Sequence, residues 1–138
     1  MEIHESVAEM VQSYAAKAVT LAAERDRLLD YGEESLKRME GILDEISKQQ
    51  SPSDVSEICK IWGSYLGEVV RRRFGGDWSI ETYPGKQFAT LTLTVKGSRL
   101  FPSMKVHRRL TQGADESVWS FYQMVRARLE SIPGARVQ

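Results

Sequence analysis

The chain has 138 residues, 19 basic and 19 acidic side chains, one cysteine and 41% hydrophobic residues. This length and composition fit one globular domain that buries a core of its own. A lone cysteine excludes an internal disulfide framework and indicates a reducing compartment, which we expect to be the cytoplasm. No apolar run is long enough to cross a membrane, and the acidic start of the chain lacks the basic residues of a signal peptide.

Charge is divided unevenly along the chain. Residues 1–59 carry 6 basic and 13 acidic side chains, whereas residues 60–138 carry 13 basic and 6 acidic ones. Two oppositely charged halves either neutralise each other inside one domain or give the protein one acidic and one basic face.

Apolar residues recur at helical spacing in the first part of the chain. They predict a helix over residues 3–26 and a second helix that ends near Lys48. The second helix is expected to begin at residues 30–33, where Asp30 and Glu33 have the spacing of a capping box. A short strand over residues 28–31 is the alternative.

The third helix, predicted over residues 52–73 with Ser51 as N-cap and Pro52 at its first position, has a wide apolar arc. An arc of this width is typical of a helix that is contacted from two sides. Gly63 and Gly67 lie four residues apart within it, and each costs about 1 kcal/mol of helix propensity. We therefore expect another backbone to approach the helix closely there.

The periodicity then changes from helical to alternating, which predicts a small antiparallel sheet. Strands are expected over residues 78–82, 88–95 and 99–101, with a turn at residues 83–86. In the second strand one face is apolar and the other carries threonines, so we expect one face to lie on the core.

Two more helices are predicted after the sheet. A short one begins at Pro102 and ends at Gly113, and a long C-terminal one has Asp115 as its N-cap and ends before Pro133. Residues 134–138 are expected to form a loose tail. The sequence thus predicts a single α+β domain over residues 1–138: three N-terminal helices, a hairpin or three-stranded antiparallel sheet, then a short and a long helix.

Few residues have the spacing that catalysis or a cofactor requires. His4 and His107 are far apart in the sequence, and Cys59 stands alone within the apolar arc of the third helix. Neither a metal site nor a nucleophilic cysteine is therefore expected. No phosphate-binding glycine loop and no G-x-S-x-G motif is present. We expect no metal, no cofactor and a protein that is not an enzyme.

A set of basic residues raises the hypothesis of nucleic-acid binding. Its members are Arg71, Arg72, Arg73, Lys105, His107, Arg108, Arg109, Arg126 and Arg128. Trp119 and Tyr83 could stack on bases. A pI near 6.7, and the interleaving of the arginines with core positions, favour solvated or interhelical ion pairs instead.

Binding of a partner protein is the function that the sequence favours, the partner being a second copy of the chain, as in a dimer, or a different protein. Trp119 lies outside the apolar arc of the last helix with Arg126 on the same flank, and Phe88 lies on the threonine face of the sheet. Arg108 and Arg109 complete the candidate interaction residues. The structural alternatives are a Trp119 that packs on the hairpin and a Phe88 that lies under the short helix.

A ligand-binding or enzymatic domain is the alternative function. Its pocket would lie between the sheet and the Gly63/Gly67 face of the third helix, with Tyr65, Glu68 and Arg71 as polar groups. A buried Glu68 that faces a cavity would favour this alternative, whereas a Glu68 paired with Arg71 or Arg72 at the surface would favour partner binding.

Several segments also carry a resemblance. Residues 63–68 read G-x-Y-x-G-E, residues 75–78 read G-G-x-W, and residues 117–122 read S-x-x-x-F-Y. With the intervening residues 101–113, they resemble a family of small bacterial domains of uncharacterised function, over about residues 28–130. The resemblance implies no activity. Some small bacterial domains of this size and layout act as immunity or partner proteins for toxins, and this analogy agrees with partner binding.

Overall fold

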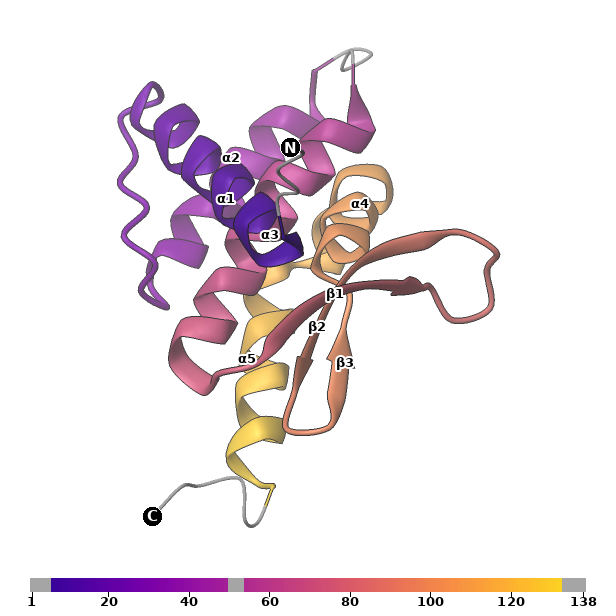
Figure 1. Ribbon diagram of the computed structural model, residues 1–138. Helices are drawn as coiled ribbons and strands as arrows, with labels where there is room; N and C mark the ends of the chain where they lie inside the picture. The colour runs from indigo at the N-terminus through magenta and orange to yellow at the C-terminus, as the bar shows by residue number, and fades with distance from the viewer. Residues whose placement is uncertain (1–5, 50–53, 133–138) are drawn as a thin grey trace, which may run out of the picture.

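A computed structural model describes residues 6–49 and 54–132. Helices α1 (Val7–Ala23), α2 (Ser35–Ser47) and α3 (Val55–Phe74) precede strands β1 (Asp77–Thr82), β2 (Ala89–Val95) and β3 (Ser98–Leu100). Helix α4 (Pro102–Gln112), the 3-10 turn η1 (Ala114–Glu116) and helix α5 (Val118–Glu130) follow. The predicted α+β class and the order of its elements are confirmed (Figure 1).

Helix α3 is the centre of the fold. Every residue from 61 to 70 is buried, because α1, α4, α5 and strand β2 all pack around this helix. The wide apolar arc predicted contacts from two sides, and the structure surrounds α3 more completely than that. A helix so enclosed positions every element that packs on it.

The two glycines of α3 lie where neighbouring elements approach most closely. A Cβ atom at Gly63 would lie 2.5 Å from the Cα of Ser103 on α4, and one at Gly67 would lie 2.2 Å from the indole of Trp78 on β1. Both distances are far below ordinary carbon contacts of about 3.5–4.0 Å. The predicted close approach of a backbone is confirmed at Gly63, whereas at Gly67 the neighbour is a side chain.

The sheet is antiparallel with the order β1-β2-β3. Trp78 pairs with Leu93 and Ile80 with Leu91, so these four side chains share one face. A turn joins β1 to β2 as predicted, with the backbone N–H of Lys86 donating to a carbonyl three residues earlier at 3.0 Å. Figure 1 shows the sheet beside the helices, with this β1–β2 hairpin extending away from them.

The connection between α1 and α2 differs from the prediction. Residues 27–34 form neither a helix nor a strand, and α2 begins at Ser35 without a side-chain cap. Tyr31 has a φ of 68°, which an α-helix does not contain. The predicted capping box is wrong, because the carboxylate of Glu33 binds residues of α5 instead of the start of α2.

The other helix starts were only partly predicted. Helix α5 has Ser117 as its N-cap rather than Asp115, which lies in the turn η1. Helix α3 has Asp54 as its N-cap. The cap predicted at residues 51–52 and the tail at residues 134–138 lie outside the described residues. Helix α1 begins with a capping box, in which the side chain of Ser6 accepts from the backbone N–H of Glu9 and the side chain of Glu9 accepts from the backbone N–H of Ser6.

Within the described residues, every helix is too short or too polar to span a membrane.

Candidate functional site

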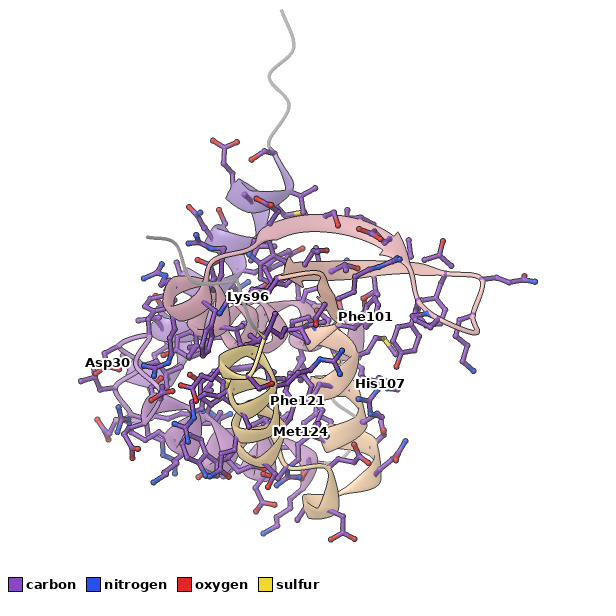
Figure 2. All side chains as sticks on the ribbon, turned by 90° about the horizontal axis from the view of Figure 1, so that it is seen from below. Asp30, Lys96, Phe101, His107, Phe121 and Met124 are labelled. Atoms are coloured by element: carbon purple, nitrogen blue, oxygen red, sulfur yellow. The ribbon has the colours of Figure 1, made fainter. Side chains whose placement is uncertain are left out.

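A groove opens between the β1–β2 hairpin and three helices. Its volume is about 690 Å³, and ligand pockets commonly enclose about 300–1,000 Å³. The lining side chains come from α1 (Met10), the first turns of α3 (Ser56, Cys59, Lys60), α4 (Ser103, Met104, His107) and the hairpin (Ile80, Lys86 and residues 88–91). Figure 2 shows His107 on the side of α4 from which the hairpin projects.

Large apolar side chains in this groove remain exposed to solvent. Ile80 is 52% and Phe88 45% exposed, and both line the groove together with Met10 and Met104. Single exposed apolar residues are normal on a protein surface, but a cluster of them in one hollow is typical of a binding surface. The groove is therefore the candidate functional site.

Aromatic packing holds Phe88 at the edge of this groove. Its ring stacks on Tyr83, with centroids 5.7 Å apart, and Tyr83 meets Phe101 edge-on at 5.2 Å. The hydroxyl of Tyr83 accepts a hydrogen bond of 2.8 Å from Nη1 of Arg108. The position of the Phe88 ring is thus held by its aromatic neighbours.

Three basic residues, Lys60, Lys86 and His107, line the groove, and its described lining contains no Asp or Glu. Cys59 is also part of the lining, but only 6% of its surface is exposed. Burial raises the pKa of its thiol to about 11. The thiol is therefore protonated at neutral pH, in which form it is a poor nucleophile.

The residues that the sequence offered for a pocket do not line this groove. Tyr65 is buried, shares a hydrogen bond with the hydroxyl of Ser35 and accepts one of 2.8 Å from the backbone N–H of Tyr31. The face of α3 that carries the two glycines is filled by Ser103 and Trp78. Tyr65 therefore stabilises the α1–α2 connection.

Glu68 is fully buried and fully engaged. It accepts hydrogen bonds from Nε and Nη2 of Arg71, at 2.6 and 2.9 Å, and from Nε1 of Trp78, at 2.8 Å. Burial by itself would raise the pKa of this carboxyl, but these bonds hold the pKa below its ordinary value. Because the buried charge is compensated inside the fold, Glu68 and Arg71 join α3 to β1 and need no ligand to explain them.

Two predicted interaction residues pair with carboxylates of the acidic half. Arg109 is only 3% exposed and binds Glu40 and Asp44 of α2. Nη1 of Arg126 lies 3.2 Å from a carboxylate oxygen of Glu33. These arginines fasten α4 and α5 to α2 and its preceding loop, so a partner cannot use Arg109 without breaking the fold.

Trp119 is partly buried and packs against the core at its margin, which the structural alternative predicted. Its ring stacks on Tyr122, with centroids 6.0 Å apart, and the Lys37 ammonium lies 4.9 Å from the ring centroid. Of the five interaction candidates, Phe88 lines the groove, whereas Trp119, Arg108, Arg109 and Arg126 do not.

Most of the basic residues considered for nucleic-acid binding form ion pairs within the fold. Those formed with carboxylates of the described residues involve Arg71, Arg72, Arg73, Lys105, Arg108, Arg109 and Arg126. Arg73, Arg109 and Arg126 pair with carboxylates of residues 1–59, whereas Arg71, Arg72, Lys105 and Arg108 pair with Glu68 and Glu116 within residues 60–138. Ion pairs between the two halves therefore neutralise only part of their charge inside the fold. Few of these cations remain free for phosphates.

Sequence reasoning missed the role of Glu40. Its Oε1 accepts hydrogen bonds from the backbone N–H groups of Val118 and Trp119, at 2.8 and 3.2 Å, and from the Ser117 hydroxyl at 3.0 Å. A carboxylate of α2 thus caps the start of α5. The groove residues Met10, Ile80 and Met104 were also not predicted from the sequence, because their apolar spacing is the same as that of core residues.

No protein-family model, no curated protein and no solved structure matches this chain, so the resemblance to small bacterial domains stays a prediction.

Proposed function

We propose that this protein is a non-enzymatic interaction module whose groove receives an apolar segment of a partner protein. The observation that carries the proposal is the exposure of Ile80 and Phe88 within one groove. Complete burial of such a side chain contributes about 1.5–3 kcal/mol, so covering a half-exposed one contributes roughly 0.7–1.5 kcal/mol. This is the kind of preformed apolar anchor on which interfaces depend.

The chemistry of the candidate pocket residues and of Cys59 agrees with binding rather than catalysis. Tyr65, Glu68 and Arg71 are engaged inside the fold, and the Cys59 thiol stays protonated at neutral pH. A single buried cysteine also agrees with a reducing compartment, and we propose the cytoplasm.

A small apolar molecule is the second candidate occupant. The volume of about 690 Å³ favours it, because this volume lies within the range of small-molecule pockets. The two candidates differ in what the purified protein retains: a partner chain in one case and a bound small molecule in the other.

The test compares three forms of the tagged protein in affinity capture from the native lysate. They are the wild type, the groove variant Ile80→Asp/Phe88→Asp, and the control Met124→Asp, which changes an apolar side chain that is 65% exposed outside the groove. We expect a stoichiometric partner with the wild type and the control and its loss with the groove variant. Size-exclusion chromatography of the purified forms detects a partner that is a second copy of the chain.

Circular dichroism and the thermal midpoint verify that the groove variant is folded. A partner that binds all three forms equally contradicts the proposal. Native mass spectrometry of the purified protein tests the second candidate. A small molecule that is bound to the wild type and absent from the groove variant identifies the groove as a ligand pocket.

A further inference from the structure

The charge of the groove indicates what its partner must carry. Lys60 lies on α3, Lys86 in the hairpin loop and His107 on α4, so basic groups border the apolar floor from three elements. The described lining contributes no carboxylate to balance them. An interface of this composition attracts negative charge.

The two lysines also have no partner among the described residues. Both are exposed, and neither forms an ion pair with a described residue. The carboxylates closest along α3 are already engaged: Asp54 accepts the N–H of Glu57 as helix cap, and Glu57 lies 4.0 Å from the ammonium of Lys17. Most arginines of the described residues, by contrast, form ion pairs. Of the described lysines without an ion pair, Lys60 and Lys86 line the groove, whereas Lys96 donates to the carbonyl of Leu129 outside it.

We infer that the groove selects an acidic segment of the partner, in which large apolar side chains are flanked by Asp or Glu. This inference rests on the proposed function. The apolar side chains cover Ile80 and Phe88, and the carboxylates meet Lys60 and Lys86. A basic segment is rejected because it would place like charges together where the apolar contacts form.

Selection from a random-peptide display library tests this inference. Wild-type protein is the target, and binders to the folded variant Ile80→Asp/Phe88→Asp are removed by counter-selection. The inference predicts enriched peptides that combine Leu, Phe or Trp with neighbouring Asp or Glu. Enriched peptides that are neutral or basic overturn the inference and leave the proposed function standing. A wild-type protein that enriches no peptide over the variant overturns both.

A pair of charge variants tests the lysines directly with one synthesised peptide from the selection. Lys60→Glu/Lys86→Glu reverses the charge at the groove, and Lys48→Glu/Arg128→Glu makes the same change in net charge at exposed residues outside it. We expect Kd to rise about tenfold or more in the groove variant and less than about twofold in the control. Equal rises in both variants would mean that only the net charge matters, which overturns the inference.

Discussion

The contact at Gly63 gives a sharp test of the packing between α3 and α4. In Gly63→Ala the new Cβ would lie 2.5 Å from the Cα of Ser103 and 2.7 Å from its backbone nitrogen. Relief to an ordinary contact requires a backbone shift of roughly 1 Å, because no flexible side chain can move away. Overpacking of this kind costs about 1–3 kcal/mol. We expect a cost in the upper part of that range, because the new Cβ meets backbone atoms of α4.

Alanine also favours the helix over glycine by about 1 kcal/mol, so the net expectation for Gly63→Ala is a loss of about 1–2 kcal/mol in the free energy of unfolding. Gly41→Ala is the matched control. It lies in α2, and its added Cβ would meet no atom within 4 Å, so the same substitution should stabilise by up to about 1 kcal/mol.

Urea unfolding followed by circular dichroism measures both variants against the wild type. A change of 1 kcal/mol corresponds to roughly 3–5 °C in the thermal midpoint for a chain of this size, so the two variants should differ by several degrees in opposite directions. A Gly63→Ala protein that is as stable as Gly41→Ala would refute the close approach of α4 to α3.

Two further predictions concern titratable groups. Hydrogen bonds from Tyr122 to Glu33, and from Arg109 and the start of α5 to Glu40, hold the pKa of each carboxyl below its ordinary value of about 4.5, although burial opposes this at both. The two ionised carboxylates stabilise the fold above their ordinary pKa, and this stabilisation is lost as the pH falls through the lowered pKa values. The urea concentration at the unfolding midpoint should therefore stay level from pH 7 to about 5.5 and decrease below about pH 4.5. A midpoint that is unchanged down to pH 3 would contradict this. Because burial raises the pKa of the Cys59 thiol to about 11, maleimide labelling at pH 7 should be much slower in the native protein than in urea, and equal rates would show that the thiol is not buried.

Local signals in the sequence predicted much of the fold. The change from helical to alternating periodicity located the sheet, and the Gly63 position in an otherwise apolar helix indicated a close neighbour. The stop of α4 at Gly113 followed from the same kind of signal, since that residue has a φ of 99°. The signals for these features lie within one or two turns of the chain, and the order of residues therefore contains them.

Only the tertiary structure decided the destinations of the charged side chains and the position of the groove. Glu33 has the spacing of a capping residue, yet it binds Tyr122, 89 residues later, because the packing of α5 brings that hydroxyl within reach. Glu40 and Arg109 are 69 residues apart. The threonine face marked Phe88 as an interaction candidate, but Ile80 has the apolar character of a core residue. Both remain exposed because the hairpin extends away from the helices. Contacts of this range depend on how whole elements pack, which periodicity and spacing along the chain do not encode.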